Sequence, residues 1–455
     1  MGTTDVDIVI AGAGAAGLAA AIAGADMGAS VLLVEGLETF RSGSNTSMST
    51  SMIPAGGSRW QREAGIEDSP DLLYDDIMTK TKGKAEPVVA RALSNVAPRL
   101  VEWLADDCLV PLELVTDVWF PGNSRLRHHC VPDRSGRTLH RHLLDAASAR
   151  SAVTLVVPSR LTDVEESKDA LRATTTRPDG SRDVIVTNSV ILATNGFGAN
   201  HDMVRQYIPE IADALYHGGD GSLGDALRIG ESLRADTASL GAYQGHGSVA
   251  SPHGVLLTWT TMMNGGLLIN SDAQRFQNET IGYSESAVNV LAQPGGVAWA
   301  VFDRQVHEKA EPFADYQDLL TMDAVKWVDD VEELAQLIGC GPEELGRTLG
   351  AARRAAQEQS TDDFGRSNWA YEIRSPYAVV KVTGALFHTQ GGLKVDESGG
   401  VLRNGSPIPG LYAAGGAAVG VSGDSSYGYV SGNGLLSALG LGFLAGSAAG
   451  KTAQG

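Results

Sequence analysis

The feature that most constrains this chain is a set of three glycines near its start. An apolar segment leads into Gly12-x-Gly14-x-x-Gly17, an alanine-rich stretch follows, and a second apolar segment, Val31–Val34, ends at Glu35. This order predicts strand, tight turn, helix and strand, which is the dinucleotide-binding arrangement. Gly12 allows the turn, Gly14 the close approach of a pyrophosphate, and Gly17 the packing of helix on strand. We expect the helix N-terminus to bind phosphates and Glu35 to accept hydrogen bonds from ribose hydroxyls.

The organisation of the chain follows from where this glycine-punctuated pattern stops and resumes. A length of 455 residues is typical of two or three structural units. Residues 1–240 and 375–455 are rich in glycine and small residues, whereas residues 241–374 are mixed and helix-rich. We therefore predict an α/β fold in which a Rossmann-like nucleotide-binding domain is interrupted by an α+β cap domain at residues 241–374.

The net charge and the cysteine content limit which binding partners and which compartment are expected. The formal net charge is −19 and no long basic stretch offsets it, so we expect neither nucleic acid nor anionic lipid as a partner. The longest apolar stretches, residues 8–24 and 434–449, are rich in glycine and alanine, and we expect no membrane span. The cysteines, Cys108, Cys130 and Cys340, are widely spaced and predict no disulfide framework, which favours the cytoplasm.

Two histidine-rich stretches raise the question of a metal site. They are His128-His129-Cys130 and His140-x-His142. No ligand set supported by carboxylates accompanies either stretch, so we interpret them as a solvated loop and a solvated helix face and expect no metal.

Several ordered blocks along the chain carry a resemblance to a known family. They comprise residues 12–17 with Glu35, and residues 45–47, 193–197, 219–221, 275–279, 389–393 and 410–415. In this order they resemble the superfamily of FAD-dependent fumarate reductase flavoproteins and 3-ketosteroid dehydrogenases over nearly the whole chain. The resemblance implies an FAD domain interrupted by a cap domain, FAD bound non-covalently, and a substrate held between the cap and the flavin ring.

The resemblance also implies which residues hold FAD. They are Gly12, Gly14, Ala15, Ala16, Gly17, Glu35, Gly36, Ser42, Asn45, Thr46, Ser47, Ala193, Thr194, Asn195, Gly196, Asp220, Gly415, Asn433, Leu435 and Leu436. The last helix, which begins near Asn433, would direct its positive N-terminus toward the flavin pyrimidine edge and stabilise the anionic reduced flavin. Family flavoproteins often have Glu where this chain has Gly416, so one hydrogen bond to the ribityl chain would be lost or replaced.

The catalytic positions depart from those of fumarate reductases. Those enzymes carry a proton-donating arginine at the place of Tyr283 and a carboxylate-clamping arginine at the place of Tyr429. Their Thr-Glu-x-x-Arg proton relay falls on Thr258, Trp259 and Met262, so the relay is absent. Since arginine binds a carboxylate through two parallel hydrogen bonds and tyrosine cannot, the exchange favours an uncharged or singly charged acceptor such as a ketone.

Other positions are retained or match the ketosteroid dehydrogenases. Two family histidines that touch substrate oxygens persist as His246 and His388. Tyr283 matches a tyrosine that accepts a proton, and Tyr429 one that hydrogen-bonds the substrate carbonyl. The pair Tyr429 and Ser431 is similar to a pair in the active site of the 4-ene-forming enzymes. The alternative for each tyrosine and histidine is a purely structural role in a cleft.

Three hypotheses follow. The first is an FAD-dependent oxidoreductase acting on CH–CH groups, which desaturates or reduces the bond α,β to a ketone, with a cyclic ketone as substrate and an unknown electron acceptor. The second is a fumarate-reductase-like enzyme for an unsaturated carboxylic acid, using His246, His388 and an arginine such as Arg304 or Arg374. The third is a non-catalytic flavin electron-transfer subunit, against which the lack of heme or iron–sulfur cysteine motifs counts.

Overall fold

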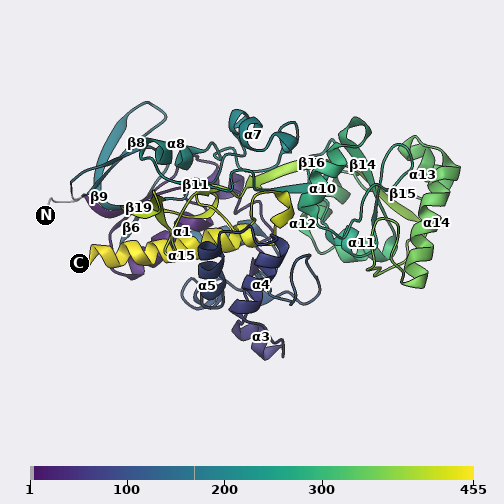
Figure 1. The fold of residues 1–455 in the computed structure, drawn as a ribbon, viewed down its shortest axis with the longest axis horizontal. Helices are drawn as coiled ribbons and strands as arrows, with labels where there is room; N and C mark the ends of the chain where they lie inside the picture. Colours follow the sequence, from purple (N-terminus) through teal and green to yellow (C-terminus); the bar gives the residue numbers. More distant parts are fainter. Residues whose placement is uncertain (1–4, 169, 455) are drawn as a thin grey trace. The chain divides into compact units, whose positions relative to one another are not determined.

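The structure is a computed structural model that describes residues 5–168 and 170–454. It divides into two compact units (Figure 1). Unit 1 comprises Met1–Pro209, Gly218–Gln244 and His388–Gly455, and unit 2 comprises Glu210–His217 and Gly245–Phe387. Unit 2 therefore extends beyond the expected cap of residues 241–374. The reason is β16 (Tyr377–Thr389), which hydrogen-bonds along β14 (Val297–Phe302) in the sheet of unit 2.

An eight-stranded sheet forms the centre of unit 1, with its main path in the order β18-β19-β9-β1-β2-β6. The five strands from β19 to β6 are parallel, β18 is antiparallel to β19, and the hairpin β7-β8 joins β9 in antiparallel fashion. The strands are β1 (Val6–Ala11), β2 (Val31–Val34), β6 (Val153–Val156), β7 (Arg160–Glu166), β8 (Leu171–Thr176), β9 (Arg182–Leu192), β18 (Gly400–Arg403) and β19 (Ser406–Ala413). This arrangement confirms the α/β fold class and the predicted strand, turn, helix and strand at the start of the chain.

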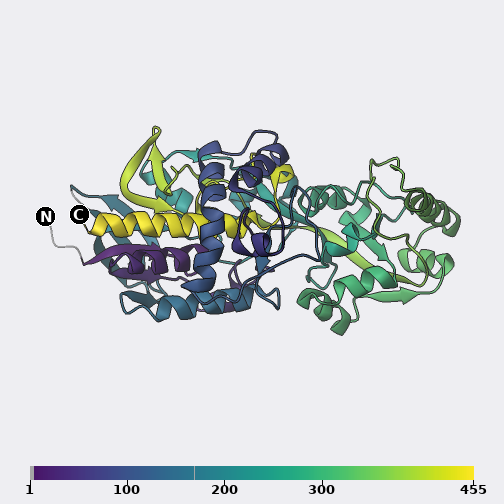
Figure 2. The ribbon, with the colours of Figure 1, turned by 90° about the horizontal axis from the view of Figure 1, so that it is seen from below.

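Two helices pack together in unit 1 at unusually close range. In Figure 2, α15 (Asn433–Ala453, yellow) runs alongside α1 (Ala15–Asp26, purple). A Cβ at Gly442 would lie 2.3 Å from the carbonyl oxygen of Ala16, and one at Gly446 would lie 2.3 Å from that of Ala20. The glycine and alanine content of both segments is therefore required by backbone contact between the helices.

The apolar helix α15 is long enough to cross a membrane by length and composition. Within the structure, however, 67% of its most apolar window is buried inside the protein. Its composition is thus accounted for by its place in the core of unit 1, between α1 and α5 (Pro87–Asp106).

The remaining elements of unit 1 surround this core. They are α2 (Phe40–Gly43), β3 (Ile53–Pro54), α3 (Arg59–Glu63), α4 (Pro70–Lys80), β4 (Glu113–Leu114), β5 (His128–Cys130), α6 (Gly136–Ser148), α7 (His201–Tyr207), α8 (Asp225–Ser232), β11 (Thr237–Ala238) and β17 (Gly392–Leu393). Strands β3, β5 and β4 form a small sheet of their own.

Unit 2 is built on a second sheet, in which β16 pairs with β10, β12, β14 and β15, and β13 pairs with β14. Its elements are β10 (Leu215–Tyr216), β12 (Tyr243–Ala250), α9 (Thr260–Met263), β13 (Leu267–Ile269), α10 (Tyr283–Leu291), β14, α11 (Arg304–Ala310), α12 (Ala314–Thr321), β15 (Lys326–Val328), α13 (Val331–Ile338), α14 (Pro342–Glu358) and β16. Strand β12 begins in unit 1 and continues into unit 2.

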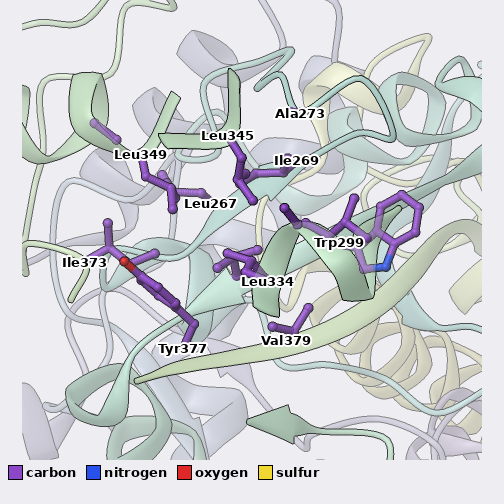
Figure 3. Close-up of a cluster of buried hydrophobic side chains, with 14 of the residues drawn as sticks. Leu267, Ile269, Ala273, Trp299, Leu334, Leu345, Leu349, Ile373, Tyr377 and Val379 are labelled. Atoms are coloured by element: carbon purple, nitrogen blue, oxygen red, sulfur yellow. The ribbon is translucent and has the colours of Figure 1, made fainter. Parts of the chain in front are cut away.

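The core of unit 2 lies between this sheet and helices α13 and α14 (Figure 3). Leu267 and Val379 come from strands, whereas Leu334, Leu345 and Leu349 come from the two helices, and all five are almost completely buried. Helices α13 and α14 thus cover one face of the sheet, within the segment 241–374 that the sequence predicted to be helix-rich.

Candidate functional site

The three glycines of unit 1 form the turn between β1 and α1. Gly12 adopts φ +103°, and a Cβ on it would lie 2.3 Å from the carbonyl oxygen of Ala193 at the end of β9. A Cβ on Gly17 would lie 1.8 Å from the carbonyl oxygen of Gly12. Gly14 is the extended N-cap of α1, with no side-chain cap. The turn therefore tolerates no side chain at Gly12 or Gly17, and it presents the N-terminus of α1 as a backbone surface.

Side chains from neighbouring segments fix this turn. Glu35 accepts hydrogen bonds from the backbone N–H of Ala13 and of Leu37, both at 2.8 Å. Thr46 Oγ1 accepts from the N–H of Ala15 at 2.9 Å. Glu35, expected to bind ribose hydroxyls, is thus held by the turn that it adjoins, and its carboxylate keeps lone pairs for a ligand.

The polar loop after α2 is largely folded into the same region. Asn45 Oδ1 accepts from the N–H of Gly219 at 2.6 Å, and Thr46 and Ser47 are buried. Ser42, in contrast, is exposed and donates only to a local backbone carbonyl, and Asp220 is exposed as well. The structure therefore brings most of the predicted FAD residues together but leaves Ser42 and Asp220 at the surface.

We call the glycine turn, Glu35 and the loop of Asn45, Thr46 and Ser47 the flavin cradle. Buried polar atoms without a partner test whether this cradle fits FAD. Among the described residues, Thr194 Oγ1 and Asn433 Oδ1 are buried and have no hydrogen-bond partner. Asn195 adopts φ +62° at the end of β9, and its Nδ2 donates to Ser222 Oγ at 2.8 Å. Buried polar atoms in native proteins are almost always hydrogen-bonded, and FAD carries both donors and acceptors. The glycine turn, the N-termini of α1 and α15 and these unpaired atoms all suit FAD.

Gly416, which stands where family members often have Glu, is explained by its neighbour. A Cβ at Gly416 would lie 2.4 Å from Asn195 Oδ1 and 2.8 Å from the backbone nitrogen of Gly196. The amide of Asn195 thus occupies the space that a side chain at position 416 would need.

A chain of hydrogen bonds runs from the start of α15 to His388. Asn433 Nδ2 donates to Ser422 Oγ at 2.8 Å, Ser422 Oγ donates to Gln390 Oε1 at 3.1 Å, and Gln390 Nε2 contacts His388 Nδ1 at 2.8 Å. Because the amide can only donate there, Nδ1 is an acceptor and Nε2 of neutral His388 carries the proton. Burial lowers the pKa of His388 to about 4, so the ring is a neutral donor at ordinary pH. Sequence reasoning missed Ser422 and Gln390.

Tyr429 and Ser431 lie in the turn just before α15. The ring of Tyr429 is 7% exposed and meets the ring of His388 edge to face at 5.8 Å between centroids. The carbonyl oxygen of Ser431 accepts a hydrogen bond from Nε2 of His128 at 3.0 Å. Unit 1 therefore brings Tyr429, Ser431 and His388 together beside the N-terminus of α15.

That contact corrects the expectation for the histidine-rich stretches. His128, His129 and Cys130 form β5 and are buried rather than solvated, and His140 is a buried residue of α6 that donates to the carbonyl of Ala13. Only His142 is not among the buried residues. Burial lowers the pKa of both His128 and His129 to about 4. Their apolar surroundings were not visible from the local sequence, because segments from β3 and α15 cover them.

His246 and Tyr283 meet in unit 2. Tyr283 is the first residue of α10, and its ring stacks on that of His246, with centroids 4.8 Å apart and planes 15° apart. Trp259 meets both rings edge to face, and Phe387 stacks on His246 from 5.2 Å. We call His246, Trp259, Tyr283 and Phe387 the ring cluster. Burial, together with the neighbouring His217, lowers the pKa of His246 to about 3, so His246 is neutral.

The acid of the 275–279 block, Glu279, has a structural role. Glu279 is fully buried and accepts hydrogen bonds from Arg275 at 2.7 and 2.9 Å and from Arg366 at 3.0 Å. Arg275 also pairs with Asp362 at 2.7 Å. These two arginines lower the pKa of Glu279 against the opposing effect of burial. Sequence reasoning missed Arg366 and Asp362, which lie more than 80 residues from Glu279 along the chain.

The two arginines named for the acid hypothesis face elsewhere. Arg304 is exposed and its guanidinium lies 4.4 Å from the centre of the Trp327 ring. Arg374 is paired with Glu372 at 2.9 Å, and its side chain is 66% exposed. Neither lies against the ring cluster in any contact recorded for the described residues.

The comparisons with known proteins decide the family. The model of the FAD binding domain family matches residues 7–432. The chain belongs to this family. A member that it resembles is the NADH:fumarate oxidoreductase of Klebsiella pneumoniae, at 29% identity over 99% of this chain and 48% of that protein. Another is the urocanate reductase of Eggerthella lenta, at 25% identity over 91% of this chain and 70% of that protein. The chain thus spans about half the length of the first relative.

Solved structures of the family agree in fold. A flavocytochrome c3 fumarate reductase in its open conformation superposes with a TM-score of 0.82, at 26% identity over 99% of this chain and 79% of that one. The 3-ketosteroid-Δ4-(5α)-dehydrogenase of Rhodococcus jostii RHA1, in complex with 4-androstene-3,17-dione, gives 0.77, at 23% identity over 98% of both chains. The second likeness concerns the fold alone.

These findings confirm several predictions from the sequence. The chain is an FAD-dependent oxidoreductase of the type that acts on carbon–carbon bonds, FAD is its cofactor, and the resemblance to fumarate reductase flavoproteins is correct. The likeness to 3-ketosteroid dehydrogenases is shown for the fold alone. On substrate, the names of the relatives support the unsaturated-acid hypothesis better than the ketone hypothesis. The individual FAD-binding and catalytic residues stay predictions.

Proposed function

We propose that this FAD binding domain family member reduces, or in reverse forms, the carbon–carbon double bond of an unsaturated acid that carries one carboxylate. Bound FAD supplies or receives the hydride. The proposal depends on two facts taken together. The chain is similar over most of its length to a fumarate oxidoreductase and a urocanate reductase, and it has tyrosines at positions 283 and 429. The likeness supports an acid, and the tyrosines oppose a second carboxylate.

The donors of unit 1 suit a single carboxylate or a carbonyl oxygen. His388 offers a neutral Nε2–H, and the turn that ends at Gly432, the N-cap of α15, leads into the first N–H groups of that helix. A helix N-terminus stabilises one negative charge without any guanidinium. Fumarate would bring a second carboxylate, for which the donors named here, His388 and the start of α15, include no guanidinium. Burying that charge unpaired is costly.

A cyclic ketone is the second candidate substrate, and one observation favours it. Tyr429 and Ser431 lie in one buried turn beside His388, where a phenol and backbone N–H groups can polarise a neutral carbonyl and acidify its α-hydrogen. Tyr283, stacked on His246, is then the candidate proton acceptor. The same groups serve desaturation and enone reduction, so the direction depends on the electron partner.

The test is reoxidation of the reduced flavin. The holoenzyme is reduced without oxygen and mixed with acrylate, fumarate or 2-cyclohexen-1-one, and flavin absorbance is followed. We expect acrylate to reoxidise the enzyme with kcat/KM at least about tenfold above that of fumarate, since fumarate lacks a charged hydrogen-bond partner.

The other outcomes are equally decisive. Preference for fumarate would contradict the argument from the tyrosines. Reoxidation by 2-cyclohexen-1-one alone would establish the ketone hypothesis in place of the acid. Failure of every acceptor would favour the non-catalytic electron-transfer subunit.

A further inference from the structure

Among the described residues of the ring cluster, Trp259 has a buried N–H group that donates no hydrogen bond. Its side chain is 5% exposed, and its Nε1 has no hydrogen-bond partner among the described residues. An indole N–H can only donate, and buried donors are nearly always paired. Trp369, another buried indole of unit 2, illustrates the usual case, because its Nε1 donates to the carbonyl of Ser360 at 3.0 Å.

The rings around Trp259 supply donors and faces rather than an acceptor. His246 lies 5.6 Å from Trp259 between centroids at 83°, and Tyr283 lies 6.4 Å away at 67°. Nδ1 of His246 accepts from the backbone N–H of Ser248 at 3.3 Å, so its Nε2 carries the proton. The cluster therefore presents two neutral N–H donors, on Trp259 and His246, among flat aromatic surfaces.

Hydrogen bonds fix the backbone of Trp259 and of the short helix that follows it. The carbonyl of Trp259 accepts from Met262 and Met263 at 3.0 and 3.1 Å, which starts α9. Arg366 donates to the carbonyls of Met262 at 3.1 Å and Gly266 at 2.9 Å, and it is anchored by Glu279. The unpaired N–H thus belongs to the residue before a short helix whose backbone is tied into a buried ion-pair network.

We propose that Trp259 binds the substrate by donating a hydrogen bond from Nε1 to a carbonyl or carboxylate oxygen of a flat, unsaturated molecule. This rests on the proposed function, and it makes Trp259 a residue that determines specificity. Fumarate reductases have the glutamate of their proton relay at this position, so the chain has exchanged an anionic side chain for a neutral donor. The exchange removes a negative charge that would repel an acid and adds a partner for its oxygen.

The kinetic test compares two tryptophans of unit 2. Trp259→Phe keeps an aromatic ring and removes the N–H, and we expect kcat/KM for the accepted one of acrylate and 2-cyclohexen-1-one to fall about tenfold. Trp259→Phe and Trp369→Phe remove the same buried ring atoms, so both should lower the melting temperature, but Trp259→Phe should lower it less, because it leaves no partner unpaired. Trp369→Phe should lower it by roughly 2–4 °C more, because the carbonyl of Ser360 loses its donor, and should leave kcat/KM unchanged.

A contrary result would show in the same two measurements. If Trp259→Phe lowers the melting temperature as much as Trp369→Phe does and leaves kcat/KM intact, the N–H is satisfied inside the protein, for example by the face of a neighbouring ring, and the proposal is wrong.

A binding measurement separates this proposal from the proposed function. In holoenzyme labelled with ¹⁵N at the tryptophan indole, one of the seven Trp signals disappears in Trp259→Phe and is thereby assigned. We expect that signal to shift downfield when acrylate or 2-cyclohexen-1-one is added. A shift without flavin reoxidation would contradict the proposed reaction but retain the binding site. Reoxidation without a shift would retain the reaction and refute the role of Trp259.

Discussion

The flavin cradle of unit 1 and the ring cluster of unit 2 differ in what builds them. The cradle is mostly backbone, with Gly12, Gly17 and the start of α1 within a few residues of one another. The ring cluster is made of side chains from β12, α10, the residue before α9 and β16, which are separated by up to 141 positions between His246 and Phe387. Backbone sites are specified by local spacing, whereas side-chain sites require the fold before their members can be recognised.

The difference also concerns charge. The cradle offers N–H groups at helix ends to a cofactor that carries phosphates, and it contains Glu35 at a fixed place. The ring cluster contains His246, which burial keeps neutral, beside the rings of Tyr283 and Trp259. Of the charged residues near it in sequence, Arg275 and Glu279 neutralise each other, and Glu285 is buried in the first turn of α10. One unit is thus suited to a polyanion, and the other to a weakly charged molecule.

The largest effect that would test this comparison is expected in the cradle. Gly17→Ala places a methyl group 1.8 Å from the carbonyl oxygen of Gly12, which forces the turn open. We expect flavin affinity to fall by more than about a hundredfold, or the turn to fail to form, as measured by flavin fluorescence after dialysis. Gly346→Ala is the control: the nearest atom to its Cβ is 3.9 Å away, and in α14 the change should stabilise by about 0.5–1 kcal/mol. Full flavin retention by Gly17→Ala would show that the cradle is not a close backbone contact.

The next effect is expected in the framework below the ring cluster. Arg366→Met removes a fully buried guanidinium and leaves the carbonyls of Met262 and Gly266 without their donor. Breaking a buried ion pair costs about 3–5 kcal/mol, so the free energy of unfolding of unit 2 should fall by that amount. Denaturant titration followed by tryptophan fluorescence measures it.

The flavin content of the folded Arg366→Met protein should not change, because the cradle lies in unit 1. Arg374→Met is the matched control, since its side chain is 66% exposed and its partner Glu372 keeps a second donor in Gln357, and the expected change is within about 0.5 kcal/mol. Loss of flavin without loss of stability in Arg366→Met would contradict the separation between the units.

The sequence predicted the backbone part of the candidate site well and the part made of distant side chains poorly. The glycine turn, Glu35 and the segment from the end of β9 to Asn195 could be predicted because each is a short pattern with one structural solution. Ser42, in α2, and Asp220, in the turn before α8, were predicted by position within a block; both are exposed, and their contact with FAD stays a prediction. The burial of His128 and His129 could not be predicted, because the segments that cover them are distant in sequence. Arg366 gave no local signal, since its partner Glu279 is fixed only by the fold.

A smaller effect is expected for the hydrogen-bond chain that joins α15 to His388. In Gln390→Glu, the carboxylate can only accept, so Nδ1 of His388 must take the proton and Nε2 becomes an acceptor. We expect kcat to fall about tenfold while flavin affinity is retained.

The added charge should also raise the pKa of His388 above its present value of about 4, so the pH profile of the variant should acquire a new titration toward neutral pH. Ser422→Ala is the control, since it interrupts the same chain without changing the proton on His388, and its pH profile should match that of the parent protein. An unaltered profile in Gln390→Glu would place His388 outside the reaction.

The smallest effect concerns the stability of the two units as the pH falls. Unit 1 holds His128, His129 and His388, and unit 2 holds His246, all with pKa values that burial lowers to about 3 to 4. The unfolded state, with a histidine pKa near 6.5, binds these protons first, so stability falls as the pH drops from about 7 toward 4. Each such histidine should cost about 0.7 kcal/mol between pH 7 and pH 6. Unit 1, with three of them, should therefore lose more stability than unit 2.

His129→Gln should remove about 0.7 kcal/mol of this loss in denaturant titrations at the two pH values, and His201→Gln, at an exposed position, should remove none. An equal loss in all three proteins would mean that His129 is protonated in the folded state, in spite of its burial and its hydrogen bond with Ser58.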